Sequence, residues 1–178
     1  DTLLITDYVS SCTSPTTQAS TFSNSAIAQT TATVGWTRGS GDNVLVVARA
    51  GAAVNADPAS GTSYSANSAF GSGTQIGTGN FVVYNGAGNS VNLTGLTAGT
   101  TYHFAVYEYN TTGICYNTTE LTGNPTTASA PSLTATGTLN EGTLNGATVN
   151  FALANTSFAD ATLSAANFTL NNAPAGVS

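Results

Sequence analysis

One histidine and two glutamates are the side chains of this sequence best suited to acid–base chemistry. His103 and Glu108 lie on the same alternating stretch, Tyr102–Tyr109, and Glu120 lies on the segment that follows it. If these segments are neighbouring strands, Glu108 and Glu120 could approach one another, like the paired carboxylates of glycosidases. A general base also needs a partner group held in place, and the face of a β-sheet offers no cleft. We therefore expect His103 to be an outward-facing strand residue and predict that the chain is not an enzyme.

Three oxygen-bearing side chains in expected turns are candidate calcium ligands. Asp42 and Asn43 lie in a turn between two expected strands, and Asp57 precedes a proline in a longer segment. Calcium prefers oxygen ligands, but the sequence lacks a loop of spaced Asp, Asn and Gly residues, and these residue types also stabilise turns. The sequence has no CxxC motif or Cys/His cluster of the kind that binds zinc. We predict no metal site and no cofactor.

Three tyrosines form a further candidate binding surface. Tyr107, Tyr109 and Tyr116 lie on or just after the stretch Tyr102–Tyr109. Exposed rings could bind a sugar or another protein, whereas rings on a sheet face can equally be ordinary packing between neighbouring strands. The sequence leaves both interpretations open.

The element that positions most of these residues is the strand Tyr102–Tyr109. Its apolar residues recur with a period of two, which predicts one buried face. A tyrosine that enters a strand just after a turn, as Tyr102 does after Gly99, is typical of the tyrosine corner of Greek-key sandwiches, whose hydroxyl binds upstream backbone. Trp36 is the only tryptophan and lies on an earlier expected strand. With Leu96, these residues form an expected core signature of Trp36, Leu96 and Tyr102.

Other segments alternate or are continuously apolar, and strands are expected at Ala32–Thr37, Asn43–Ala50, Asn80–Tyr84, Ser90–Leu93 and Thr118–Thr126. The near-continuous apolar run of Asn43–Ala50 predicts a central position in a sheet. Asn80–Tyr84 and Ser90–Leu93 flank a Gly-rich connection, which predicts a hairpin. The long segment Gly51–Gly79 is expected to pack on the sandwich or to form short edge strands. No helix of normal length is expected, so the predicted fold class is all-β.

The composition excludes several classes of function. Charged residues make up 6% of the 178 residues, against about 25% in a typical soluble domain. The formal net charge is −6, and Arg38 and Arg49 are the only arginines in a chain without lysine. Binding to nucleic acid needs several cations that neutralise phosphates, so we predict no nucleic-acid partner. No apolar run reaches the roughly 18 residues that span a bilayer, so no membrane span is expected.

Residues 13–127 resemble the fibronectin type III-like modules of large secreted, multidomain bacterial surface proteins. The resemblance rests on the core signature, on the strand Tyr102–Asn110, and on the stretches Trp36–Arg49 and Gly73–Gly77. It implies a Greek-key sandwich with an extracellular or cell-surface location. It also implies a structural or adhesive role.

Residues 128–178 resemble the opening of an immunoglobulin-like repeat from similar surface proteins. Short strands are expected at Val149–Leu153 and Ala166–Leu170. A complete sandwich needs about seven strands and about 100 residues. We therefore expect an incomplete immunoglobulin-like β-domain in this part of the chain.

The resemblance also implies a disulfide between Cys12 and Cys115. In a fibronectin III topology, the segment before the first strand and the loop after the strand Tyr102–Tyr109 lie at the same pole, which makes the bridge geometrically feasible. The alternative is a pair of free thiols. A disulfide implies an oxidising compartment.

Residues 1–12 are expected to form an extended strand and a linker, with no obvious place in the sandwich. The apolar residues of this segment are Leu3, Leu4, Ile5, Tyr8 and Val9. Either the sequence is a window from a long tandem array, or this segment completes the C-terminal part of a neighbouring copy by strand donation. Strand donation from head to tail builds a filament when the contact does not close.

Both explanations predict a structural or adhesive module of an extracellular bacterial surface protein or filament. Its partners are then neighbouring copies or domains of the same protein, with surface polysaccharide as a further candidate. The alternative function is an accessory module, carbohydrate-binding or spacer, of a secreted hydrolase.

Overall fold

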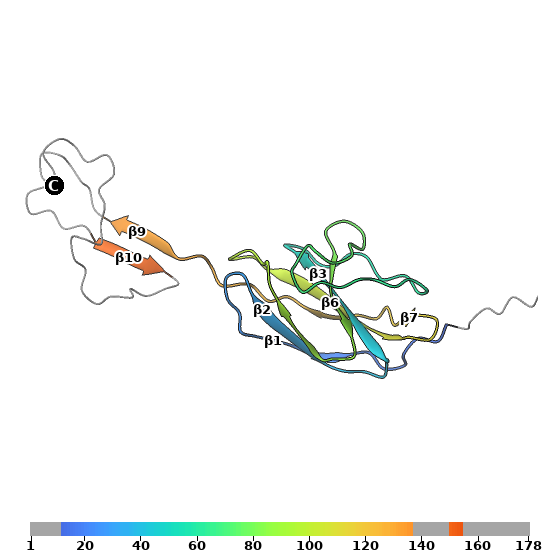
Figure 1. Ribbon diagram of the computed structural model, residues 1–178. Helices are drawn as coiled ribbons and strands as arrows, with labels where there is room; N and C mark the ends of the chain where they lie inside the picture. The colour runs from blue at the N-terminus through green and yellow to red at the C-terminus, as the bar shows by residue number, and fades with distance from the viewer. Residues whose placement is uncertain (1–11, 137–149, 155–178) are drawn as a thin grey trace, which may run out of the picture. The chain divides into compact units, whose positions relative to one another are not determined.

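The computed structural model describes residues 12–136 and 150–154 of the chain (Figure 1). The chain divides into two compact units, Asp1–Ala130 and Pro131–Ser178. All regular secondary structure in the described residues is β-strand. The predicted all-β fold with a fibronectin III-like sandwich is confirmed by the two antiparallel sheets of the first unit.

The smaller sheet of the first unit has three strands, in the order β1-β2-β5. These strands are β1 (Ser20–Ser25), β2 (Ala32–Thr37) and β5 (Ser90–Leu93). Both neighbouring pairs are antiparallel, and Val34 on β2 lies opposite Val91 on β5. The strands expected at Ala32–Thr37 and Ser90–Leu93 are therefore confirmed.

The larger sheet has the order β4-β3-β6-β7, and β8 also pairs with β6. Its strands are β3 (Asn43–Ala50), β4 (Phe81–Gly86), β6 (Tyr102–Asn110), β7 (Cys115–Tyr116) and β8 (Leu121–Gly123). β3 lies between β4 and β6, so its expected central position is confirmed. The sequence did not indicate β7, whose two residues pair with the end of β6.

The two sheets pack face to face around one apolar core. Alternate residues of β3 and β6 enter this core, because successive side chains of a strand point to opposite faces. Trp36, Leu96 and Tyr102 are 4%, 5% and 2% exposed and all belong to the core. The Tyr102 hydroxyl accepts a hydrogen bond from the backbone N–H of Thr97 at 2.9 Å. This bond ties the turn that precedes β6 to the beginning of the strand.

The expected hairpin of Asn80–Tyr84 with Ser90–Leu93 is wrong. β4 pairs with β3 and β5 pairs with β2, so the chain crosses between the sheets at residues 87–89. Non-local bonds hold this crossing: the backbone N–H of Trp36 donates to the Asn89 carbonyl at 2.9 Å, and the Arg38 guanidinium donates to the Ala87 carbonyl. A Gly-rich connection suits a crossing as well as a hairpin, and the partner strand decides between them.

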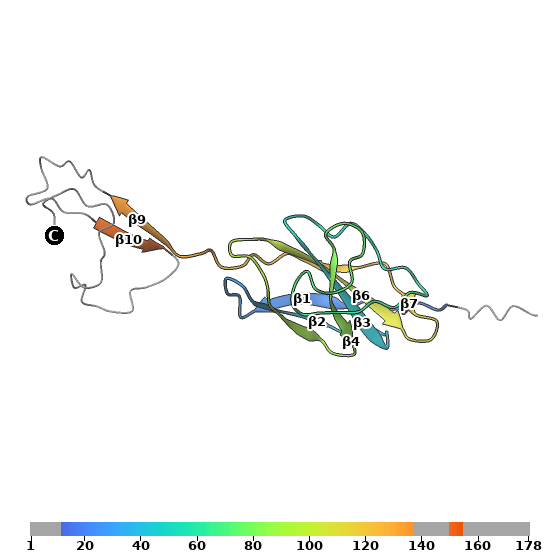
Figure 2. The ribbon, with the colours of Figure 1, turned by 45° about the horizontal axis from the view of Figure 1, so that its top comes forward.

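The segment Gly51–Gly79, here called the covering segment, packs on the outer face of the larger sheet, as the sequence predicted. Figure 2 shows it, coloured teal to green, passing in front of that sheet. A second apolar cluster lies under it, formed by Leu45, Val47, Ile76, Val82, Ala105, Tyr107, Tyr109 and Tyr116, with Val54, Ala56, Tyr64 and Ile114 packed against them. The larger sheet is therefore buried on both faces.

The covering segment also occupies the edges of two strands. The Val82 N–H on β4 donates to the Thr74 carbonyl at 2.9 Å, and the Val82 carbonyl accepts from the Asn67 N–H at 3.2 Å. Just beyond β5, the Thr94 N–H donates to the Ser68 carbonyl at 3.0 Å. These bonds satisfy backbone groups that a sheet edge otherwise leaves open.

Ile76 tests whether the covering segment contributes to stability. Its side chain is 7% exposed and belongs to the second apolar cluster. The change Ile76→Ala is expected to lower the free energy of unfolding by about 2–3 kcal/mol, because it removes buried methylene groups and leaves a cavity. Guanidinium denaturation followed by Trp36 fluorescence measures this loss. The matched control is Ile27→Ala at a 36% exposed position, where a change below about 0.5 kcal/mol is expected.

The second unit contains one described pair of strands. β9 (Ser132–Thr136) and β10 (Asn150–Ala154) are antiparallel, with Thr134 opposite Ala152. β10 overlaps the strand expected at Val149–Leu153, whereas β9 was not expected. The strand expected at Ala166–Leu170 lies outside the described residues, and the immunoglobulin-like repeat stays a prediction.

Candidate functional site

Glu108 and Glu120, which the sequence allowed to approach one another, do not form a carboxylate pair. Glu108 is fully buried between the sheets, on the same side of β6 as Phe104. Glu120 is exposed and lies with His103 along an open groove of about 290 Å³ beside β8. Alternation along β6 explains the difference, because it directs Glu108 inward and His103 outward. The expected outward position of His103 is confirmed.

Glu108 instead forms a buried site with the turn between β2 and β3. Its Oε1 accepts hydrogen bonds from Arg38 Nε at 2.9 Å and from the Gly39 N–H at 2.6 Å. Its Oε2 accepts from Arg38 Nη2 at 3.0 Å and from the Gly41 N–H at 3.1 Å. Two guanidinium and two backbone donors thus compensate the loss of water around the carboxylate.

Arg38 extends this site to two further parts of the sandwich. Its Nη2 also donates to the Gly41 carbonyl at 2.8 Å, and its Nη1 donates to the Ala87 carbonyl in the crossing between the sheets. The hydrogen bond with Glu108 is the main cause that raises the pKa of Arg38. One guanidinium therefore joins β6, the turn after β2 and the crossing, which makes this a structural site.

The turn around Glu108 requires glycine at two positions. A Cβ added to Gly39 would collide with the backbone carbonyl of Thr17 and with the backbone of Gln18. A Cβ added to Gly41 would lie 2.9 Å from the backbone of Tyr109 and 2.7 Å from Glu108 Oε2. Only glycine allows the backbone to approach the carboxylate and β6 so closely.

The rings of Tyr107, Tyr109 and Tyr116 are not available as a binding surface. They are 1%, 7% and 3% exposed, because the covering segment packs over them. Their hydroxyls also have partners inside the protein: Tyr107 donates to Asp57 Oδ1 at 3.0 Å, and Tyr116 donates to the Thr62 carbonyl at 3.0 Å. Of the two interpretations that the sequence left open, ring packing is correct.

Alkaline titration tests the burial of these rings. Burial is the main cause that raises the pKa of Tyr107 and of Tyr116 well above the ordinary value of 10.0. A phenol whose pKa is higher in the folded than in the unfolded chain stabilises the fold fully at pH values below the unfolded pKa. This contribution is lost as the pH rises from the unfolded pKa through the folded pKa. We expect both phenols to ionise only when the protein unfolds, as a step in absorbance at 295 nm that coincides with loss of the β-sheet circular dichroism signal. Reversible ionisation of all seven tyrosines in the folded chain would contradict this expectation.

The candidate calcium ligands also form hydrogen bonds with other residues of the sandwich. Asp42 accepts hydrogen bonds from the Thr111 N–H at 2.8 Å and from Thr111 Oγ1 at 2.9 Å. The backbone bond and then the hydroxyl bond lower the pKa of the Asp42 carboxyl. Asn43 Nδ2 donates to the Tyr109 hydroxyl at 3.2 Å, and Asp57 accepts from Tyr107. Residues 12–136 and 150–154 contain no group of three or more His, Cys, Asp or Glu residues placed to hold a metal ion.

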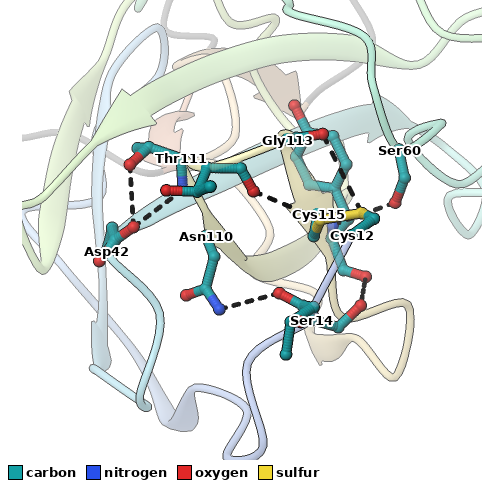
Figure 3. The surroundings of a disulfide bond; sticks show 11 residues. Cys12, Ser14, Asp42, Ser60, Asn110, Thr111, Gly113 and Cys115 are labelled. Carbon is teal, nitrogen blue, oxygen red and sulfur yellow. Dashed lines mark hydrogen bonds between the residues drawn. A yellow bond between two sulfur atoms is a disulfide. The ribbon is translucent and has the colours of Figure 1, made fainter. Parts of the chain in front are cut away.

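A disulfide joins Cys12 to Cys115 at the end of the sandwich where β6 turns into β7 (Figure 3). The two Cα atoms are 5.4 Å apart, within the usual range for a disulfide. Cys115 is fully buried, whereas Cys12 is exposed. The bridge therefore fixes the beginning of the described chain to the interior of the larger sheet.

Hydrogen bonds continue this attachment along residues 13–18. Asn110 Nδ2 donates to the Thr13 carbonyl at 2.9 Å, and Ser14 Oγ donates to the Tyr116 carbonyl at 2.9 Å. Gln18 Nε2 donates to the carbonyls of Asn117 and Thr119. The segment that leads into β1 is thereby held against β7 and the residues that follow it. The proposed strand donor, Leu3, Leu4, Ile5, Tyr8 and Val9, lies outside the described residues.

Sequence reasoning missed the buried pair of Arg38 and Glu108. The signal was present, since Tyr102, Phe104 and Val106 define the inward face of β6 and Glu108 continues the same alternation. A buried carboxylate needs a cation, and the chain has only two arginines.

No helix among the described residues has the length and apolar character needed to cross a membrane.

No family model matches this sequence, and no curated protein matches it significantly. Among solved structures, a computationally redesigned β-sandwich protein is similar over 63% of this chain and 95% of its own, with 18% identity and a TM-score of 0.44. A fibronectin type III domain of human fibronectin type III domain containing protein 3 matches over 66% and 90%, with 15% identity and a TM-score of 0.43. A fibronectin type III domain of human collagen XX matches over 62% and 91%, with 18% identity and a TM-score of 0.40.

Proposed function

We propose that this chain is a structural module of an extracellular protein, in which the sandwich joins neighbouring domains or copies end to end. The observation that carries this proposal is the position of the two chain connections of the sandwich. Residues 12–115 are closed by the disulfide next to Asn110, at one end of β6. Ala128 is hydrogen-bonded to Ala28 and Gly99, near the other end of β6. β6 has nine residues, so these ends lie about 27 Å apart.

A module whose connections leave from opposite poles advances the chain by its own length. Such a geometry suits a row of domains or copies, and it leaves the sides of the sandwich free of chain connections. The disulfide supports a location outside the reducing cytosol. The candidate functional groups all form hydrogen bonds inside the protein, at Glu108, Tyr107, Tyr116 and Asp42. This supports a structural role over catalysis.

The finer proposal is a secreted or surface-displayed bacterial protein, or a filament, as the sequence resemblance implies. In that setting residues 1–11 pair with the C-terminal unit of the next copy by strand donation. The accessory carbohydrate-binding module is the weaker alternative, because the rings it needs are covered. An immunoglobulin-like C-terminal unit is part of the same proposal.

Electron microscopy of the chain purified from its source tests the structural role. Rows or filaments with a regular axial repeat, located outside the cell, are expected. Isolated monomers that bind polysaccharide on affinity gels would overturn the proposal and favour the accessory module.

Deletion of residues 1–11 separates strand donation from a simple tandem array. This deletion keeps Cys12 and the disulfide, so the sandwich is expected to fold normally. Loss of end-to-end assembly, measured by light scattering and microscopy, supports donation. Assembly that survives the deletion refutes donation and leaves the structural role intact.

A further inference from the structure

We infer that the disulfide between Cys12 and Cys115 diverts pulling force around most of the sandwich. Under tension between the chain before Cys12 and the chain after Ala130, the bridge leaves residues 116–130 as the only part of the sandwich backbone that can extend. The inference depends on how the chain is connected and holds whether or not the proposed function is correct.

The connectivity of the sandwich gives this force path directly. The two cysteines are 103 positions apart, and the covalent loop that they close contains β1 to β6. A force applied to Cys12 reaches Cys115 through the bridge, so it cannot extend the backbone between the two cysteines. β7 begins at Cys115, and β8 (Leu121–Gly123) follows outside the loop.

The bonds that resist the force are therefore those of the last strand and the residues after it. β8 pairs with β6, where Gly123 lies opposite Phe104 and Leu121 opposite Val106. Beyond β8, the Pro125 carbonyl accepts from the Tyr102 N–H at 2.9 Å.

Thr127 adds a dense group of bonds at the end of this segment. Its Oγ1 donates to the Thr97 carbonyl at 2.6 Å and accepts from the Thr100 N–H at 2.9 Å. Its backbone N–H donates to the Thr100 carbonyl at 3.0 Å. Thr127 is 5% exposed, so water competes little for these bonds.

The geometry loads these bonds together. The force enters residues 116–130 at Cys115, near the Asn110 end of β6, and leaves at Ala130, near the Tyr102 end. It therefore acts along β8 and β6, in shear, so that the bonds between the two strands share the load. Strands pulled at one end would instead open one bond at a time.

Breaking these bonds frees a short length of chain while the bridge is intact. About 15 residues lie between Cys115 and Ala130, and an extended chain spans about 3.5 Å per residue, so they extend to about 50 Å. After reduction the loop also opens. Its 103-residue span adds about 360 Å of extended chain at the same length per residue.

Single-molecule force extension of the full chain, held by handles at its two ends, tests this inference. The oxidised chain is expected to unfold the sandwich in a short step, and the chain in dithiothreitol in a step longer by about 360 Å. The second unit contributes equally to both measurements and cancels in the difference. Equal step lengths before and after reduction would overturn the inference.

The double variant Cys12→Ala, Cys115→Ala should reproduce the long step without a reductant. If this variant does not fold, the wild-type chain folded first and then reduced on the tether provides the same comparison. A short step in either unbridged form would overturn the inference.

A pair of threonine variants then locates the force-bearing bonds. Thr127→Val removes hydroxyl bonds outside the loop and is expected to lower the rupture force of the oxidised chain. Thr33→Val removes the bond from Thr33 Oγ1 to Asn92 Oδ1, at 2.9 Å inside the loop, and is expected to leave that force unchanged. An equal decrease in both variants would overturn the assignment of the load to residues 116–130.

Discussion

Changing Cys12 and Cys115 together to alanine is expected to lower the free energy of unfolding by about 4 kcal/mol. The two positions are 103 residues apart, so the bridge removes much of the freedom of the unfolded chain. Loss of the bridge returns that freedom and favours the unfolded state. The change is measured by guanidinium denaturation without a reductant, with fluorescence of Trp36 as the probe of the sandwich.

The single variant Cys12→Ala is the control that separates the bridge from packing. Cys12 is exposed, whereas Cys115 is fully buried, so this variant breaks the bridge and leaves the buried side chain in place. It is expected to lose nearly as much stability as the double variant. If Cys12→Ala retained wild-type stability, the bridge would contribute nothing and the chain-entropy account would fail.

The second large effect is expected at the buried carboxylate. Glu108→Gln keeps the shape of the side chain but removes the charge that two backbone N–H groups and Arg38 bind. Breaking a buried ion pair costs about 3–5 kcal/mol because it leaves the other charge without compensation. Arg38 keeps 21% exposure, so about 3 kcal/mol is expected. The same fluorescence-detected denaturation measures it.

Two controls make this test specific. Glu120→Gln makes the same chemical change at an exposed position and should alter stability by less than about 0.5 kcal/mol. In a double-mutant cycle, Arg38→Met with Glu108→Met should cost less than the sum of the single changes, because the second change removes an already unpaired charge. Additive costs would show that the two side chains do not stabilise one another.

Local patterns in the sequence were sufficient for the central strands β2 and β3. The alternation in Ala32–Thr37 and the apolar run in Asn43–Ala50 match β2 and β3 at both ends. Each strand carries this information in its own side chains, since burial of one or both faces dictates the pattern. The central position of β3 followed from the same rule.

Pairing between distant segments was harder to predict. The Gly-rich connection after β4 suggested a hairpin, but β5 pairs with β2, more than 50 positions earlier in the chain. A glycine-rich turn permits either route. Whether β5 pairs with β4 or with β2 depends on the edge of β2 that β1 leaves open and on the bond from the Trp36 backbone N–H to the Asn89 carbonyl. Neither feature can be read from a short window of sequence.

Whether the rings of Tyr107, Tyr109 and Tyr116 are buried or exposed depends on the covering segment. Leu45 and Val47 on β3 already indicated that the outer face of the larger sheet is buried. Tyr107 lies opposite Leu45 in the neighbouring strand, so the same inference could have been extended to it. The covering segment itself is too rich in Gly, Ser and Ala to show which of its residues would pack on that face.

The bonds between the covering segment and β4 and β5 have a consequence for solubility. Charged residues make up only 6% of the chain, so few charged side chains are available to protect its strand edges. An open, apolar strand edge in such a protein would recruit strands from other molecules and seed cross-β aggregates. Because part of the same molecule already occupies these backbone groups, crowding does not make them available for such aggregation.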